Sequence, residues 1–144
     1  MSKVLSLTQP WASLVCLGAK KIETRSWHTN YRGGLLIHAS KAYPKWAKEC
    51  EEEEPFLSAL RPGGVYCEPA AVCGQIIGQC RLVDCIHTQA VARLNPLEAE
   101  FGDFSPGRYA WILEQASFLF HPIPAKGALG LWEHPSLNWS KIDT

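Results

Sequence analysis

Residues 9–40 read QPWASLVCLGAKKIETRSWHTNYRGGLLIHAS. The stretch predicts a short helix that starts at Thr8–Pro10, because proline suits the first turn of a helix. Gly18 follows the last apolar position of that helix and predicts its end. Ile22–Trp27 and Leu35–Ala39 then have the alternating or continuous apolar pattern of two strands. Charged residues, tryptophans and a histidine occur here more densely than a stable core requires, so this stretch is the first candidate for a functional site.

The rest of the chain predicts more short elements. We expect a strand at Val4–Leu7, a helix within Pro44–Glu54, one or two strands within Val72–Ile86, strands at Tyr109–Leu113 and Phe118–Phe120, and a last short strand near Trp132. Gly74 and Gly78 indicate a bend or bulge in the middle strands. Short strands with interspersed helices and many glycines predict an α+β fold, namely a small mixed β-barrel with short flanking helices.

Length and charge limit the function classes. The chain has 144 residues and a net charge of +0, and its length fits one domain over residues 1–144. Residues 1–48 contain eight basic residues and one acid, whereas residues 49–144 contain six basic and thirteen acidic residues. The basic half indicates an anionic partner, unless the two halves interleave in the fold and neutralise each other. There is no run of about 18 apolar residues and no signal-like start, so we expect no membrane partner and a cytoplasmic or nuclear location.

The cysteines do not form a recognisable framework. They are Cys16, Cys50, Cys67, Cys73, Cys80 and Cys85. A disulfide set is disfavoured because no export signal accompanies it. The spacings among the last four match no common zinc-ligand pattern. We therefore expect mostly small buried thiols, with no metal and no cofactor.

Residues 18–25 contain the pattern Gly-x-Lys-x-x-Glu-x-Arg. QPWASL precedes it, YRGGLLIHASK follows it, and RYAW at 108–111 and PAKG at 124–127 come later. Together these motifs resemble the ASCH domain family (ASC-1 homology) over nearly the whole chain. The resemblance implies a PUA-like β-barrel with a cleft lined by the patterned residues. It also implies that the chain binds RNA or another nucleic acid.

The resemblance leaves enzymatic activity open. One subgroup of the family is an amidohydrolase that removes the acetyl group of N4-acetylcytidine, and other members resemble nucleases. The subgroup's lysine corresponds to Lys20, but Glu23 stands at its threonine position. No acid in Gly74–Val83 matches the subgroup's glutamate. If the chain is an enzyme, Lys20 and Glu23 are its catalytic candidates.

The nucleic-acid-binding candidates are Lys20, Glu23, Arg25, Trp27, Arg32, His38, Ser40, Lys41 and Lys126. Glu23 and Arg25 lie two residues apart on a predicted strand, so they share one face. They could bind a base amino group and a phosphate, or form a structural ion pair. Lys20 is either a phosphate or substrate contact or a solvated lysine beside Lys21. Trp27 is either a stacking platform for a base or a core residue.

The remaining candidates follow from their positions. Arg32 lies in a turn and is either a phosphate contact or solvated. His38 follows an apolar run, where a histidine is more often a satisfied core group than a catalyst. Ser40 and Lys41 end that strand at a rim, where binding groups commonly lie. Lys126 belongs to either a phosphate-binding loop or a plain turn.

The predicted function is binding of RNA or single-stranded nucleic acid through a basic cleft, with a salt-sensitive affinity. Two alternatives remain. One is an enzyme that acts on RNA or on a modified nucleoside, which requires a pocket that excludes water. The other is a protein-interaction module of a transcription coactivator, which predicts a protein partner and an exposed apolar patch.

Overall fold

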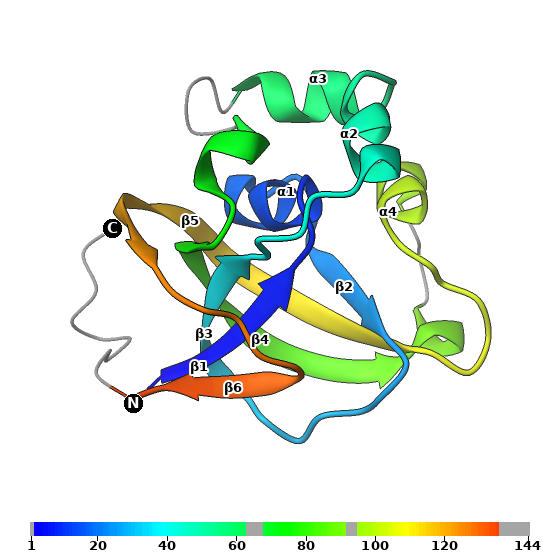
Figure 1. Cartoon of the computed structure of the whole chain (residues 1–144). Helices are drawn as coiled ribbons and strands as arrows, with labels where there is room; N and C mark the ends of the chain where they lie inside the picture. The colour runs from blue at the N-terminus through cyan, green and yellow to red at the C-terminus, as the bar shows by residue number, and fades with distance from the viewer. Residues whose placement is uncertain (1, 63–67, 92–94, 136–144) are drawn as a thin grey trace.

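The computed structural model describes residues 2–62, 68–91 and 95–135 (Figure 1). The strands in these ranges are β1 (Ser2–Leu7), β2 (Ile22–Arg25), β3 (Gly33–Ala39), β4 (Gln75–His87), β5 (Tyr109–Pro124) and β6 (Leu131–His134). The helices are α1 (Trp11–Leu17), α2 (Lys45–Glu51), α3 (Phe56–Leu60) and α4 (Pro96–Phe101), with 3-10 turns η2 (Pro69–Val72) and η3 (Thr88–Ala90). The α+β class is therefore confirmed.

The predicted closed barrel is wrong. The strands form one sheet in the order β2-β5-β4-β3-β1-β6, and within the described residues the two end strands do not pair with each other. β1 and β3 are parallel, and the other neighbouring strands are antiparallel. The sheet curves strongly around α1 because register shifts interrupt the β3–β4 and β4–β5 pairings (Figure 1).

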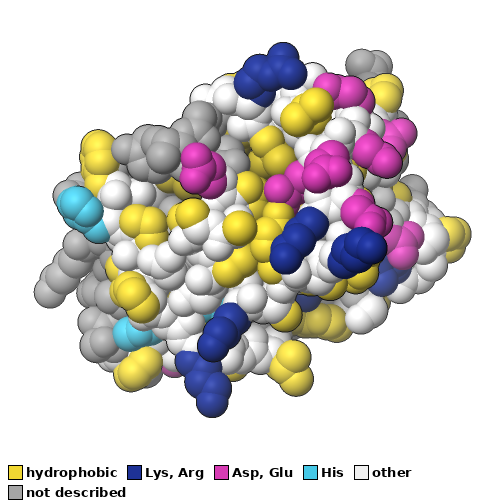
Figure 2. Space-filling view, turned by 45° about the horizontal axis from the view of Figure 1, so that its top comes forward, with side chains coloured by type: hydrophobic (Ala, Val, Ile, Leu, Met, Phe, Trp, Pro, Cys, Tyr) yellow, Lys and Arg dark blue, Asp and Glu magenta, His cyan; other side chains and the backbone are white. Residues whose placement is uncertain are grey.

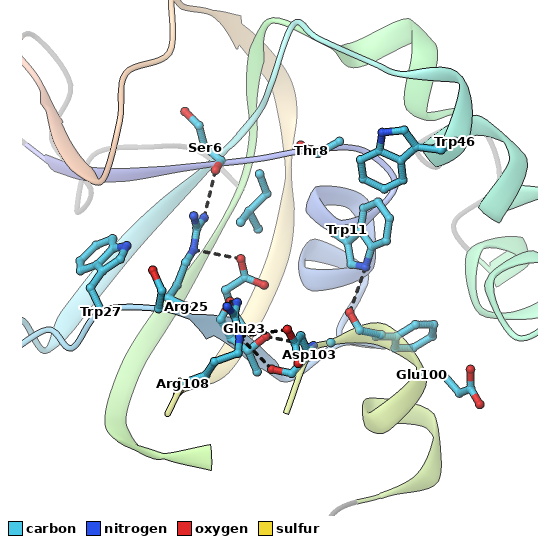
Figure 3. Close-up of a pocket in the computed structure, with 15 residues that line it drawn as sticks. Ser6, Thr8, Trp11, Glu23, Arg25, Trp27, Trp46, Glu100, Asp103 and Arg108 are labelled. Atoms are coloured by element: carbon cyan, nitrogen blue, oxygen red, sulfur yellow. Dashed lines mark hydrogen bonds and ion pairs between the residues drawn. The ribbon is translucent and has the colours of Figure 1, made fainter. Parts of the chain in front are cut away.

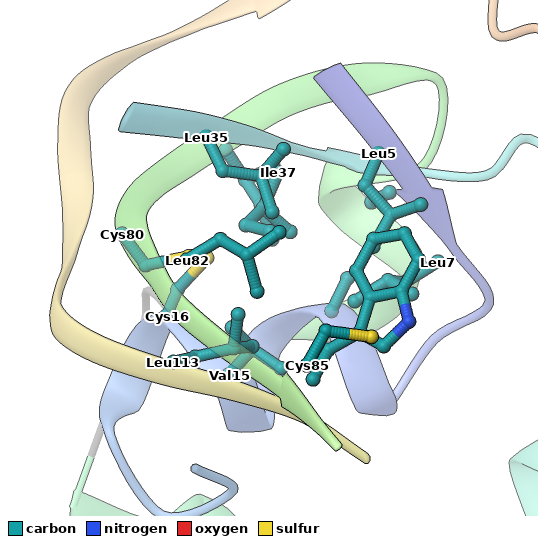
Figure 4. Close-up of a cluster of buried hydrophobic side chains, with 14 residues drawn as sticks. Leu5, Leu7, Val15, Cys16, Leu35, Ile37, Cys80, Leu82, Cys85 and Leu113 are labelled. Carbon is teal, nitrogen blue, oxygen red and sulfur yellow. The ribbon is translucent and has the colours of Figure 1, made fainter. Parts of the chain in front are cut away.

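The main core lies between α1 and the concave face of the sheet. Leucines and isoleucines of β1, β3 and β4 pack there with Val15 and Cys16 of α1 and with Trp111 of β5 (Figure 4). A smaller apolar cluster lies on the outer face of the sheet, and another joins α1 to α3 and α4. β3 contains a continuous run of buried apolar residues at 35–37, rather than an alternating pattern, because both of its faces are covered.

Two predicted glycine positions are required by the fold. Gly18 ends α1 in the left-handed conformation (φ 82°), and its N–H donates to carbonyls of the last turn. Gly78 lies at a register shift, and a Cβ there would overlap Cys16 Sγ and lie 2.6 Å from the Ser117 carbonyl oxygen. Gly78 thus allows β4 to pass between the helix and β5.

Some boundaries differ from the prediction. Pro10 rather than Thr8 is the residue before α1, and no side chain caps the helix there. The side-chain amide of Gln9 instead accepts the Ser13 N–H at 2.9 Å and donates to the Ser13 hydroxyl at 2.8 Å.

The two strands predicted at Tyr109–Leu113 and Phe118–Phe120 are one strand, β5, which continues through Gln115 at φ 54°.

Candidate functional site

A pocket of about 540 Å³ opens where the ends of β1 and β2 meet α1, α2 and the segment between α4 and β5 (Figure 3). Its lining residues are Ser6, Leu7, Thr8, Trp11, Glu23, Thr24, Arg25, Ser26, Trp27, Trp46, Glu100, Phe101, Gly102, Asp103 and Arg108. The fold brings together chain positions up to about a hundred residues apart at this point. Three of the predicted site residues line the pocket: Glu23, Arg25 and Trp27.

Glu23 and Arg25 lie on one face of β2, as predicted. Arg25 Nε lies 3.2 Å from Glu23 Oε2, and Arg25 Nη2 donates to the Ser6 carbonyl at 3.2 Å. The ion pair and the backbone contact hold the guanidinium across the end of β1. The pair therefore presents an acceptor and a donor side by side at the pocket wall.

Lys20 lies beneath the pocket rather than in it. Its side chain is only 1% exposed, its Nζ lies 3.6 Å from Glu23 Oε1, and it donates to the Ile22 carbonyl. A Cβ at Gly102 would lie 3.4 Å from this Nζ, so the pocket-lining segment at Gly102 covers the ammonium group. Lys20 therefore balances the charge of Glu23 from below and makes no contact with solvent phosphate in this conformation.

Glu98 of α4 completes the buried charge cluster. One of its carboxylate oxygens accepts the Lys21 backbone N–H. Burial raises the pKa of Glu98, and this hydrogen bond and the nearby Lys20 ammonium act in the opposite direction. The cluster fixes α4 against the start of β2, which places the following Phe101–Asp103 segment on the pocket rim.

Three indoles supply the apolar walls. Trp11 and Trp46 stand at one end of the pocket and Trp27 at the other, with Arg25 and Glu23 between them (Figure 3). Trp11 and Trp46 lie 5.6 Å apart between ring centroids, and Trp11 Nε1 donates to the Phe101 carbonyl at 2.9 Å. Trp46 is 59% exposed. Trp27 packs edge-on against the buried Trp111, at 4.7 Å and 89°. Trp27 is thus both a core contact and a wall of the pocket.

Arg108 and Asp103 form a fixed rim. Arg108 Nε donates to the Asp103 carbonyl at 3.1 Å, and Arg108 Nη2 donates to the Thr24 carbonyl at 3.2 Å. Asp103 accepts from the Ser105 hydroxyl and backbone N–H, and these hydrogen bonds lower the pKa of the Asp103 carboxyl. The rim segment is therefore held by its own polar contacts rather than by burial.

The pocket is not the basic cleft that the sequence predicted. Its described lining contains two arginines and three acids, Glu23, Glu100 and Asp103. The expected lysine is buried, and each arginine faces a carboxylate. Figure 2 shows the same mixture on the helical face, where acidic and basic side chains lie next to each other instead of forming one basic patch.

The other predicted site residues lie outside the pocket. His38 is buried between Ser6 Oγ, at 2.9 Å from Nδ1, and the Ala125 carbonyl, at 2.7 Å from Nε2. Arg32 donates to the Thr29 carbonyl and lies 3.6 Å from Asp84. Lys126 is exposed and follows Ala125, the residue whose carbonyl contacts His38. The structure thus gives His38 a packing role and places the other two away from the aromatic walls.

Ser40 and Lys41 lie at the end of β3, near the pocket rim. The Ser40 N–H donates to the carbonyl of Leu7, which lines the pocket, at 2.9 Å. Lys41 follows and is exposed. Lys41 is therefore an exposed cation one residue from a backbone contact of the lining, and it is not part of the lining itself.

Long-range ion pairs join the basic and acidic parts of the chain. Lys3 lies 2.9 Å from Glu133, and Arg32 pairs with Asp84, so the two halves interleave, as the alternative interpretation of the charge distribution proposed.

The described cysteines form no disulfide with one another. Cys16, Cys80 and Cys85 are buried, and Cys50 and Cys73 are partly so. Cys67 lies outside the described residues. Within those ranges no group of His, Cys, Asp and Glu is arranged to hold a metal ion, and no helix is long and apolar enough to cross a membrane.

Sequence reasoning missed several lining residues. Trp46, Glu100 and Asp103 were not predicted, and a core role was favoured for Trp11 over a stacking role, because these positions approach β2 only through tertiary packing. Arg108 was noticed only as part of a motif. The one local signal was a tryptophan among charged residues in a predicted helix, since an aromatic side chain that such a helix leaves exposed often marks a binding surface.

Comparisons with known proteins agree with the motifs. The family model for the ASCH domain matches residues 5–128. Activating signal cointegrator 1 of Mus musculus and of Homo sapiens are each 30% identical to the chain over 129 residues, which is 90% of this chain and 22% of each relative. The chain therefore spans about a fifth of the length of these curated relatives.

Solved structures are similar at a lower level. The crystal structure of ASCH from Zymomonas mobilis has a TM-score of 0.49 and 16% identity, over 85% of this chain and 73% of that chain. A mutant of the Zymomonas mobilis protein has a TM-score of 0.48 and 15% identity, over 85% and 75%. The family model covers most of the sequence, including the pocket-lining residues of β1, β2 and the segment before β5. The chain belongs to the ASCH domain family.

Proposed function

We propose that this chain is a single ASCH domain that binds RNA or single-stranded nucleic acid by taking one unpaired nucleobase into the pocket. The observation that supports this most directly is the combination of three tryptophans with a carboxylate–guanidinium pair in a cavity of about 540 Å³. Aromatic side chains stack on any base, and polar groups between them can recognise a base edge.

The polar wall is suited to a nucleobase. Glu23 offers carboxylate oxygens that accept from an exocyclic amino group, and Arg25 offers donors to a carbonyl or ring nitrogen. Lys20 keeps Glu23 charge-balanced from below, so a neutral base can approach the carboxylate without leaving it unpaired. Glu23 and Arg25 are thus proposed as base-reading residues rather than as phosphate contacts.

Phosphate contacts belong at the rim in this proposal. Lys41 is the exposed cation at the end of β3, next to Ser40 and the pocket-lining Leu7. His38 is left out because it is buried, and Arg32 and Lys126 are left out because they lie away from the lining. The small number of rim cations makes stacking, rather than charge, the main contribution to affinity.

The test is fluorescence anisotropy of a labelled eight-nucleotide RNA, with matched DNA and duplex, titrated with wild type and with Trp46→Ala. Trp46 is largely exposed, so its truncation removes stacking surface at little cost to the fold. We expect a loss of about 1–3 kcal/mol in binding. Leu57→Ala on the adjacent α3, an exposed apolar residue at 44%, is the matched control and should bind like wild type. Equal binding by both variants, or no binding by wild type, would refute the proposal.

A catalytic role is the second candidate, and one observation favours it. The buried cation of Lys20 lies next to Glu23, which lines the pocket, and the buried carboxyl of Glu98 lies near Lys20. Glu23, with Lys20 beneath it, could then act as a general base on a modified nucleoside or on RNA. Incubation with labelled RNA and with N4-acetylcytidine, read by denaturing gel and chromatography, tests this. Turnover lost in Glu23→Gln would support it, and unchanged substrates would exclude it.

A coactivator-type protein interaction is favoured only by the name of the relatives, activating signal cointegrator 1. This proposal includes a protein partner and a nuclear or cytoplasmic location. It predicts that tagged wild-type chain retains a defined partner after nuclease treatment. Loss of every partner after that treatment would instead support the nucleic-acid proposal.

A further inference from the structure

We infer that a second base-stacking platform lies beside the pocket, formed by His28, Tyr109 and His87, and that it takes the nucleotides next to the one whose base enters the pocket. The inference rests on the proposed function and extends it from one nucleobase to a short strand. None of the three platform residues lines the pocket, so the platform is a separate site.

Strand register places the platform next to the pocket wall. Tyr109 of β5 lies opposite Arg25 of β2 and opposite His87 of β4. Residues directly opposite each other in antiparallel strands project from the same face, so these three form one row across the sheet. The row begins at the pocket-lining Arg25 and leads away from the cavity.

The rings of the platform are already in contact. The centroids of His87 and Tyr109 lie 4.9 Å apart with the planes tilted by 34°, and those of His28 and Tyr109 lie 5.5 Å apart at 73°. Both imidazoles are exposed, whereas Tyr109 is half-buried against the core beside Trp111. Tyr109 therefore anchors the row, and the two histidines offer ring surface that the core does not use.

The spacing fits consecutive nucleotides. Adjacent strands are about 4.8 Å apart, so His87 lies about 10 Å from Arg25 along the row. A stacked strand advances about 3.4 Å per nucleotide, which makes this distance equivalent to two or three nucleotides. A strand that places one base in the pocket can thus place its next bases on the platform without a gap.

The neighbouring groups favour a nucleotide over a plain aromatic ligand. His28 directly follows Trp27, so a pocket wall and the platform are consecutive in the chain. Arg108 directly precedes Tyr109 and lines the pocket rim. Arg108 thus joins the pocket rim to the platform, and the phosphate that links the two nucleotides would lie beside it.

The test compares ligand lengths. Wild type and the double variant His28→Ala/His87→Ala are titrated with a labelled mononucleotide and with a labelled six-nucleotide single strand of the same base. We expect the double variant to bind the mononucleotide like wild type and the longer strand at least about fivefold more weakly, since loss of one stacked base corresponds to about 5- to 150-fold. His28→Phe/His87→Phe should restore the affinity, because it keeps the ring surfaces. His121→Ala, at an exposed histidine farther along β5, is the matched control.

The outcomes separate the two proposals. If wild type binds both ligands and the double variant binds the longer strand equally well, the platform is refuted and the pocket proposal stands. If wild type binds neither ligand, the proposed function is refuted and the platform with it. If the phenylalanine variant fails to restore affinity while its thermal unfolding matches wild type, stacking is excluded as the basis of the platform.

Discussion

Lys20 Nζ lies 3.6 Å from Glu23 Oε1, with the lysine buried under the carboxylate that lines the pocket. One carboxylate thus faces a buried cation on its inner side and the cavity on its outer side. Neutralising either member leaves the other as a poorly compensated charge, because water does not reach the lysine. The ion pair is therefore part of both the fold and the site.

Replacing Lys20 should destabilise the protein strongly. Lys20→Ala removes a buried charge from Glu23 and Glu98 and should lower the free energy of unfolding by about 3–5 kcal/mol. Lys21→Ala, at the exposed neighbouring lysine, should change it by less than about 0.5 kcal/mol. Urea denaturation of both variants measures the difference. Similar stabilities would show that Lys20 is not buried as described.

Gly78→Ala should be poorly tolerated. The new Cβ would overlap Cys16 Sγ and the Ser117 carbonyl, and the backbone partner has no rotamer with which to retreat. We expect a loss of about 3 kcal/mol or more, at the upper end of overpacking effects. Gly107→Ala, where no atom lies within 4 Å of the Cβ but φ is +89°, should cost about 1–2 kcal/mol. Thermal unfolding of the two variants compares these losses. A larger loss for Gly107→Ala than for Gly78→Ala would show that Gly78 does not lie close to Cys16 and Ser117.

His38 should make stability fall in acid. Burial lowers the pKa of His38 from its ordinary value of 6.5, with the hydrogen bond to Ala125 acting against this shift. At pH values well above about 6.5 the ring is neutral in both the folded and the unfolded states, and its contribution is complete. As the pH falls toward the lowered folded pKa, the unfolded state binds the proton first, so stability drops by up to about 1.4 kcal/mol per pH unit.

The measurement is the urea midpoint of wild type and His38→Gln from about pH 8 to about pH 5, a range that spans the ordinary histidine pKa. Burial and the neighbouring Glu52 raise the pKa of Glu51 to about 7, which contributes a slope of opposite sign. Both proteins contain Glu51, so the difference between their urea midpoints at each pH removes its contribution and leaves that of His38. Parallel curves for the two proteins would contradict the prediction.

Salt should affect nucleic-acid binding only modestly. The pocket has two arginines, both paired with acids, so few phosphates can be neutralised there. With two phosphate contacts, affinity for a single strand should fall less than about tenfold between about 50 and 200 mM salt. Anisotropy titrations across that range measure the slope. A fall of about a thousandfold would indicate a basic track elsewhere on the surface.

The positions of individual helices and strands were largely predictable from sequence. Which segments continue into one strand, and which strands pair in the sheet, were not. Gly18 ends α1 as expected because its signal is local. The polar Glu114–Ser117 segment reads as a break, yet it continues β5 because pairing with β4 holds it in place. Closure of the sheet has no sequence signal at all, since it depends on which distant strands meet.

The site followed the same rule. The shared face of Glu23 and Arg25 follows from the two-residue period of a strand. The burial of Lys20 and the approach of Trp46 depend on packing of α4 and α2, which no local pattern records. The pattern of charged residues therefore identified the polar wall of the pocket. It did not show which of these residues are buried or which aromatic residues complete the pocket.

The two end strands of the sheet have a consequence for self-association at high concentration. β2 and β6 are each four residues long, so each of these two end strands exposes only a short row of unpaired backbone groups. Glu23 and Arg25 on one of them and Glu133 on the other add charge to those rows. Short, charged edges are poor templates for strand addition by a second molecule. The two end strands of a sheet that does not close into a barrel can in this way resist edge-to-edge pairing.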